Sequence, residues 1–231
     1  GTNFGFTNGA NHTGVYQPTI TSYDYNALLS EAGDMTPAFH AVRKIIEDKY
    51  GALPPLTVEN SKKAAYGKVK LTEKAFILDA APKMVERIHR AAPQFQEDIG
   101  QSFGYTLYST VIKGPREELE LGYDCLHDRA VFYMDGKYAG TIERSRLEKI
   151  KMPFLGVNDE IKLDILVENM GRVNYGPHMG DNKGITGVRF GQQLHFGWDM
   201  FPLEMDDFTK VPFEKADGGV EAASFMRGEL V

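Results

Sequence analysis

Residues 161–169 read IKLDILVEN, and this stretch decides the fold class. Its side chains fall into two alternating sets, Ile161, Leu163, Ile165 and Val167 on one side and Lys162, Asp164, Leu166 and Glu168 on the other. A period of two residues is that of a β-strand, whose neighbouring side chains point to opposite faces of the sheet. One apolar face and one more polar face predict a half-buried strand in an antiparallel sheet.

Further strands are predicted on both sides of this stretch. AVFYMDGKYAGTI (130–142) is typical of a hairpin whose two-residue turn is Asp135-Gly136. FGYTLYSTVI (103–112) and GITGVRFGQQLHFGWDMFPL (184–203) are rich in Tyr, Val and Phe and are interrupted by glycines. Short strands joined by Gly and Asp turns favour a mainly β fold, an antiparallel β-sandwich or jelly-roll-like domain, over a sheet of alternating strands and helices.

The N-terminal part of the chain predicts a different structure. After a Gly-, Asn- and Tyr-rich stretch (1–33), Thr36 and Pro37 form a favoured helix start. One apolar stripe follows at helical spacing, made of Phe39, Val42, Ile45, Ile46 and Tyr50. A glycine ends the predicted helix, and GALPPL (51–56) is a stiff linker at a boundary. PKMVERIHRAAP (82–93), between two prolines, is compatible with either a short helix or a loop.

Composition narrows the class of partner. The formal charge of −6 argues against a nucleic-acid duplex or an anionic membrane surface as the main partner. No apolar run approaches the roughly 18 residues that a membrane span needs. The first residues lack the basic and apolar regions of a signal peptide, so none is predicted. A single cysteine, Cys125, excludes an internal disulfide framework.

Common catalytic and metal motifs are absent from the sequence. The six histidines are scattered without the spacing of metal ligands, so no metal is predicted. Without a P-loop or a G-x-G-x-x-G run no nucleotide cofactor is predicted, and without G-x-S-x-G no serine nucleophile is supported. The 32 acidic residues offer many carboxylate pairs, but no spacing selects one pair for glycoside hydrolysis.

Tyrosines near loops are the candidate binding residues. Three of them gather beside Asp24 in the opening segment: Tyr16, Tyr23 and Tyr25. Tyr175 lies in NMGRVNYGPHMGDNKG (169–184). Aromatic faces pack against pyranose rings, so this pattern is compatible with a sugar site. The pattern alone favours the simpler alternative, in which the tyrosines pack under loops and Arg172 pairs with Asp181 across one.

Six segments, in this order along the chain, match a known family: GTNFGFTNGAN (1–11), QPTITSYDYNALLSEAGDMTP (17–37), GYTLYST (104–110), LHDRAVFYMDGKYAGTIER (126–144), LDILVENMGRVNYG (163–176) and DNKGI (181–185). They resemble glycoside hydrolase family 35, the β-galactosidases. The resemblance implies that residues 1–52 are the last strand, loop and helix of a catalytic (β/α)8 barrel. Residues 53–215 would form the family's all-β sandwich, and residues 216–231 the truncated start of a galactose-binding-like jelly roll.

The resemblance also implies where the chemistry lies. Retaining glycosidases use two carboxylic acids about 5–5.5 Å apart. In this family both are glutamates on earlier barrel strands, with no matching position here, so no catalytic residue is assigned to the chain and Glu31 is rejected as one. Tyr25 matches a tyrosine that hydrogen-bonds the galactose, and Tyr175 matches one that leans from the β-sandwich toward the sugar. No cofactor is implied.

Three charged residues of the matching segments are expected to support the site rather than contact the sugar: Asp24, Arg172 and Asp181. A buried charge has to be paired, and such pairs would fix the loops around the site.

Two functions follow as hypotheses. The first is part of a retaining exo-β-galactosidase acting on β-galactosides, in which this chain supplies one wall of the sugar site and an upstream catalytic barrel is its partner. The 231 residues alone are then expected to be inactive. The second is a stand-alone, non-catalytic carbohydrate-binding or structural β-sandwich from a truncated gene. A periplasmic or secreted bacterial location is the expectation for either, and the oligomeric state is not predicted.

Overall fold

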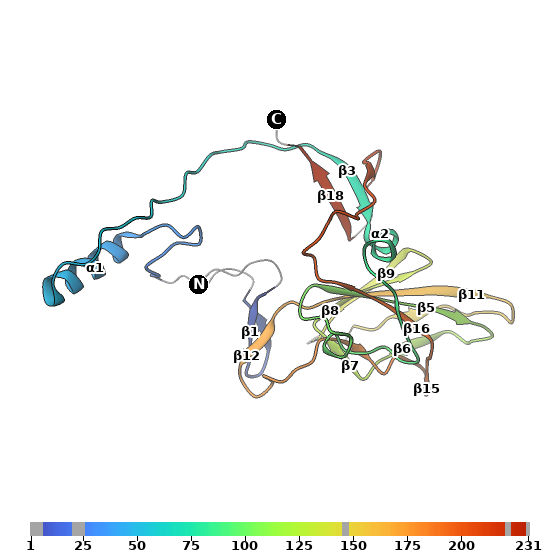
Figure 1. Cartoon of the computed structure of the whole chain (residues 1–231). Coiled ribbons are helices and arrows are strands. Elements are labelled where there is room, and N and C mark those ends of the chain that lie inside the picture. Colours follow the sequence, from blue (N-terminus) through green and yellow to red (C-terminus); the bar gives the residue numbers. More distant parts are fainter. Residues whose placement is uncertain (1–6, 20–25, 145–147, 220–222, 230–231) are drawn as a thin grey trace.

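The predicted mainly β fold is confirmed by a computed structural model, which describes residues 7–19, 26–144, 148–219 and 223–229. A six-stranded antiparallel sheet is its largest element, in the order β4 (Ile88–Arg90), β16 (Trp198–Leu203), β5 (Tyr105–Lys113), β11 (Glu160–Glu168), β8 (Arg129–Met134) and β9 (Lys137–Glu143). Shorter strands pack against its inner face: β10 (Lys151–Met152), β6 (Leu119–Gly122), β14 (Arg189–Phe190), β7 (Cys125–His127) and β13 (Gly184–Thr186). The exposed β15 (Gln193–Leu194) pairs with β14. Between these layers lies an apolar core around Trp198, Phe132 and Tyr108, so the domain is a β-sandwich (Figure 1).

The predicted hairpin is confirmed in detail. Strands β8 and β9 pair with Met134 opposite Lys137, which leaves Asp135 and Gly136 as the turn. Both turn residues have positive φ, 47° and 73°, as the two-residue hairpin turn whose twist matches that of the strands requires.

The prediction of a half-buried strand at 161–169 is wrong for the second face of that strand. β11 is the predicted strand, but Asp164 and Leu166 are as deeply buried as the residues of the apolar face. The reason is a second apolar layer on the outer side of the sheet. Helix α2 (Ile77–Met84) buries most of its side chains there, in a cluster that includes Leu166, Tyr133 and Phe201.

Helix α2 also decides the structure of residues 82–93, for which the sequence was compatible with either a short helix or a loop. The helix begins upstream at Ile77, continues over Pro82 and ends at Met84, and β4 occupies 88–90. Beside it lies a small antiparallel sheet in the order β17 (Glu214–Lys215), β3 (Leu71–Phe76) and β18 (Ser224–Gly228). A short 3-10 helix, η1 (Glu97–Ile99), precedes β5.

The predicted N-terminal helix is confirmed as α1 (Pro37–Tyr50). The Thr36 hydroxyl accepts a hydrogen bond from the amide of Phe39 and caps the helix, and Gly51 ends it with positive φ. None of its residues is buried, and Figure 1 shows it standing apart from the sheets. Residues 51–70 have no regular structure. Within the described ranges, no helix is long and apolar enough to cross a bilayer.

Candidate functional site at the junction of the N-terminal strands and the sandwich

A parallel strand pair joins the N-terminal segment to the sandwich. β1 (Gly9–His12) pairs in parallel with β12 (Arg172–Tyr175) and antiparallel with β2 (Tyr16–Pro18). The register sets Gly9 opposite Arg172 and Asn11 opposite Tyr175. Figure 1 shows β1 and β12 side by side at one end of the sandwich. The first strands of the chain therefore share a sheet with a strand more than 150 residues later.

Two glycines at the ends of β12 allow this close approach. Gly171 has φ 148°, and a Cβ there would lie 2.8 Å from the carbonyl oxygen of Gly9. Gly176 has φ 113°, and a Cβ there would lie 2.1 Å from the carbonyl oxygen of His12. Real Cβ atoms are not found so close to backbone, and positive φ is itself costly for other residues. Any side chain at either position would push β1 away from β12.

Asp128 is the centre of the polar contacts beneath this sheet. Asp128 directly follows β7, and Lys183 directly precedes β13. These two strands pair antiparallel with His127 opposite Gly184, so the pairing brings the two charged side chains together. Lys183 Nζ lies 2.9 and 2.8 Å from the two carboxylate oxygens of Asp128. Asp128 is 1% exposed and Lys183 is fully buried. Burial lowers the pKa of Lys183, and the Asp128 carboxylate opposes that shift.

The same carboxylate and ammonium hold the chain just before β12. Asp128 Oδ2 accepts a hydrogen bond from the amide of Met170 (3.0 Å), and Lys183 Nζ donates to the carbonyl oxygen of Gly171 (2.7 Å). The Tyr16 hydroxyl lies 2.6 Å from the Gly171 oxygen and 3.0 Å from Asp128 Oδ2, so its proton is donated to one of these two acceptors. Tyr16 thereby connects β2 to the same centre.

Tyr16 is protonated in this environment. Burial and the neighbouring Asp128 carboxylate raise the pKa of its phenol far above the ordinary value. Its ring lies under two cations, with the Arg144 guanidinium 4.6 Å and the Lys183 ammonium 5.0 Å from the ring centroid. A phenol face attracts cations, most strongly when they are desolvated. Tyr16 is therefore a packed structural residue, as the simpler alternative held for the tyrosines of the opening segment.

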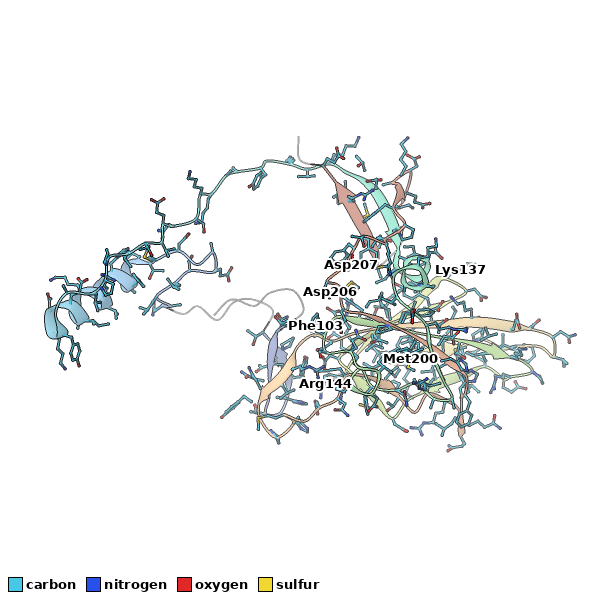
Figure 2. All side chains as sticks on the ribbon, in the orientation of Figure 1. Phe103, Lys137, Arg144, Met200, Asp206 and Asp207 are labelled. Atoms are coloured by element: carbon cyan, nitrogen blue, oxygen red, sulfur yellow. The ribbon has the colours of Figure 1, made fainter. Side chains whose placement is uncertain are left out.

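Arg144 extends the network outward, and it is labelled in Figure 2. Its guanidinium donates to Asp128 Oδ1 (2.9 Å) and to Asp181, and lies 3.3 Å from His12 Nδ1. Burial alone would lower the pKa of Arg144, but hydrogen bonds to Asp181 and Asp128 raise it. Burial alone would raise the pKa of Asp181, but the hydrogen bond from Arg144 lowers that pKa below its usual value. The imidazole of His12 stacks on that of His178, with centroids 4.2 Å apart.

The predicted site residues fall into three groups. Asp24 and Tyr25 lie outside the described residues. Tyr175, at the end of β12, is 65% exposed, so its ring and hydroxyl are available to a ligand. The alternative that Arg172 and Asp181 pair with each other is wrong, because Asp181 pairs with Arg144 whereas Arg172 pairs with Glu97.

Arg172 ties β12 to the segment before β5. Its guanidinium donates to Glu97 and to the carbonyl oxygen of Ser102, with Nε 3.0 Å from that oxygen. Glu97 also accepts from the amide of Lys183 (3.0 Å), so the ion pair is continuous with the Asp128 centre.

Substitution of Arg172 by histidine is therefore expected to destabilise the sandwich by about 1–2 kcal/mol, since an imidazole cannot donate to both partners and the site is partly exposed. The measurement is urea unfolding of the chain, followed by the fluorescence of the buried Trp198. Arg189→His is the matched control, because Arg189 pairs only with the exposed Asp124 among the contacts described for its side-chain nitrogens. Equal midpoints for wild type and Arg172→His would contradict the supporting role.

The histidines of this junction predict acid sensitivity. Burial, then Arg144 and His178, lower the pKa of His12, and burial lowers that of His127. A histidine with a depressed native pKa binds fewer protons folded than unfolded, so stability is complete above about pH 6.5 and is lost as the pH falls below it. The melting temperature is expected to fall between pH 7 and pH 5, and His12→Gln should flatten this dependence. His89→Gln, at an exposed site on β4, is the control; a parallel pH dependence for His12→Gln and wild type would contradict the assignment.

Sequence reasoning did not assign their roles to four of the residues that form the junction: Tyr16 as an anchor to Asp128, Asp128 itself, Arg144 and Lys183. The signal that could have found three of them was present, since Asp128, Arg144 and Lys183 all lie in segments that resemble the family. What the sequence lacked was their pairing, because 55 positions separate Asp128 from Lys183 and 112 separate it from Tyr16.

Comparisons with known proteins match two parts of the chain to family models. Residues 93–204 match the family model described as the first all-beta domain of beta-galactosidase, and residues 1–49 match the model of glycosyl hydrolases family 35. The described sandwich is thus the first all-β domain of the β-galactosidase class. By both matches, the chain is a homologue of the family 35 β-galactosidases over most of its length, and the resemblance seen in the sequence is confirmed.

Similar proteins come from plants, animals and bacteria. Beta-galactosidase 17 of Arabidopsis thaliana is 38% identical over 92% of this chain and 33% of its own length. Beta-galactosidase of Bos taurus is 39% identical over 91% of the chain and 32% of its own length. Beta-galactosidase of Xanthomonas manihotis is 38% identical over the whole chain and 38% of its own length. The chain therefore spans about a third of the length of the curated relatives it matches.

Proposed function

We propose that this chain works as part of a retaining exo-β-galactosidase that removes terminal β-D-galactose from β-galactosides. Its role is to supply one wall of the sugar site and the accessory β-domain, while the two catalytic glutamates belong to an upstream barrel. The observation that supports this proposal is the β1–β12 pair. β1 lies in the region matched by the family 35 model and β12 in the region matched by the β-domain model, so the pair joins the two parts.

Two tyrosines are the proposed sugar contacts. Tyr175 ends β12 with most of its side chain exposed, and Tyr25 follows β2 by seven residues in the sequence. A phenol offers an apolar face to the C–H groups of a pyranose and a hydroxyl that can donate or accept. Asp24, Arg172 and Asp181 are proposed as supports of the loops that bear them, which agrees with the protein partners of Arg172 and Asp181.

The barrel is also the proposed partner of α1. The apolar stripe of this helix remains accessible, with Val42 38%, Ile46 37% and Ile45 65% exposed. A single amphipathic helix gains most of its stability by burying such a stripe. We expect the residues before Gly1 in the complete protein to cover it, as the last helix of a barrel would be covered by its neighbours.

Hydrolysis of a chromogenic β-galactoside tests the proposal. The 231-residue chain is assayed beside the complete gene product that contains it. Activity only in the complete protein is the expected result, because the acid/base and nucleophile of a retaining glycosidase are then both present. Activity in the short chain would mean that its own carboxylates act. No activity in either would remove the β-galactosidase proposal.

One observation favours the alternative of a non-catalytic carbohydrate-binding domain. A cavity of about 560 Å³ lies between the outer face of the six-stranded sheet and β18, with five aromatic residues in its lining: Tyr105, Tyr133, Tyr138, Phe208 and Phe225. Aromatic-rich cavities of this size are typical of small-ligand sites. Binding of galactose to the 231-residue chain, abolished by Tyr138→Ala, would support this alternative, and unchanged binding in that variant would exclude the cavity.

A further inference from the structure

We propose that Asp128, together with Lys183 and Tyr16, positions the exposed Tyr175 at the end of β12 without touching the sugar. The inference rests on the proposed β-galactosidase function and adds to it a positioning centre that lies in the sandwich, not in the barrel. Its basis is that one buried ion pair holds the backbone just before β12, the strand that ends at Tyr175, and also contacts the side chain of Tyr16 on β2.

The first step concerns β12. Asp128 accepts from the amide of Met170 and Lys183 donates to the carbonyl of Gly171, so the peptide units on both sides of Met170–Gly171 are held where the strand starts at Arg172. β12 then runs only four residues to Tyr175. Three of its four residues, Arg172, Val173 and Tyr175, pair with β1, with a register shift at Asn174. Over so short a strand a change at its start is transmitted to its end.

The second step concerns β2. Tyr16 is its first residue and lies 2.6 Å from the Gly171 oxygen and 3.0 Å from Asp128 Oδ2. At the far end of this strand the amide of Thr19 donates to the carbonyl of Gly9 (2.8 Å), which closes the hairpin against β1. The β1–β2 hairpin is thus anchored to the same centre that holds the start of β12.

The third step is why this centre is rigid. Asp128 and Lys183 are both out of water, and every alternative placement of either side chain would leave a buried charge with fewer partners. Groups that bind a reacting ligand have to be held within a fraction of an ångström by such surrounding contacts. An exposed tyrosine on a loop without such contacts would not supply a directed hydroxyl, whereas one at the end of a fixed strand does.

Tyr16→Phe is the variant that tests the positioning role. It keeps the ring that faces both cations, and it leaves Asp128 and Gly171 with Lys183 as partner, so the protein is expected to fold. Tyr108→Phe is the matched control, since Tyr108 is a fully buried tyrosine of the same domain whose hydroxyl donates to the carbonyl of Gln94 (2.8 Å). Both variants are made in the complete gene product and measured for thermal stability, for kcat and KM with a chromogenic β-galactoside, and for amide hydrogen exchange.

The expected result separates the two variants by activity and not by stability. Both melt a few degrees earlier, but only Tyr16→Phe lowers kcat/KM, by about tenfold, because small misplacements of binding groups have effects of that size. Only Tyr16→Phe should speed exchange at residues 9–12 and 172–175. Equal kinetics and equal exchange for the two variants would overturn the positioning role alone. An inactive wild type would overturn the proposed function and this inference with it.

Discussion

Substitution of Asp128 by asparagine is expected to lower the free energy of unfolding by about 3–5 kcal/mol, the range for removing one partner from a buried ion pair. Lys183 would keep its charge without an anion, although it is fully buried. The new amide would also present N–H groups among the donors of Lys183, Arg144 and Met170, which all now point at carboxylate oxygens. The measurement is the urea midpoint of the chain, followed by Trp198 fluorescence.

Asp164 offers a matched control in the same domain. It too is 1% exposed, but neither of its oxygens has a hydrogen-bond partner among the described residues. Lys162 Nζ lies 3.0 Å from Oδ2, so we interpret this contact as an ion pair without hydrogen-bond geometry. Asp164→Asn removes a charge with little lost hydrogen bonding, and its midpoint should move by far less than that of Asp128→Asn.

The double variant Asp128→Asn, Lys183→Met tests the cause of the loss. Removing both charges leaves Arg144 with Asp181 as its anion, so the double variant should recover part of the stability lost in Asp128→Asn. If the double variant were less stable than Asp128→Asn by as much as Lys183→Met alone destabilises the wild type, the two side chains would act independently. A loss below about 1 kcal/mol in Asp128→Asn itself would contradict the central place given to this residue.

Substitution of Tyr25 by phenylalanine in the complete enzyme is expected to lower kcat/KM for a β-galactoside by about 5- to 150-fold. This range corresponds to about 1–3 kcal/mol, the cost of leaving a buried hydroxyl of the sugar without its hydrogen-bond partner. The ring remains, so stacking on the pyranose is kept and only the directed hydroxyl is lost. The prediction rests on the match of the SYDY segment (22–25) to the family, because Tyr25 lies outside the described residues.

Steady-state kinetics decide this prediction, with Tyr66→Phe as control. Tyr66 is 74% exposed in the segment without regular structure, so its hydroxyl should not affect the sugar site. Unchanged kcat/KM in Tyr25→Phe, with the control also unchanged, would remove Tyr25 from the proposed site. For a residue that contacts the substrate and does not contribute to folding stability, we expect a lowered kcat/KM with an unchanged melting temperature.

Local pattern was enough to predict the elements whose partners are close in sequence. The turn at Asp135-Gly136 and the helix capped by Thr36 depend on neighbours within a few residues, and both were correct. The outer face of 161–169 was wrong because its cover, α2, comes from about 80 residues upstream and no pattern within the strand reports it. Asp164 looked like a surface residue for this reason.

The site shows the same limit more strongly. Tyr175 is exposed and Arg172 pairs with Glu97, and the roles of both residues at the sugar site are proposals. The meeting of Tyr16, Asp128 and Lys183 depends on three strand pairings at once, so no spacing in the sequence signals it. Buried charges of this kind look like ordinary surface residues until the fold brings their partners together.

The β1–β12 pair also sets an order of events during synthesis. β1 and β2 leave the ribosome before β12, the strand with which β1 pairs in parallel, which follows by more than 150 residues. Closing so long a loop is costly in entropy until the sandwich that holds β12 has already formed. β1, paired only with β2, must therefore wait for the second half of the β-domain. The proposed wall of the galactose site is then completed only after the sandwich has formed. A folding error in the sandwich would leave β1 without its partner β12.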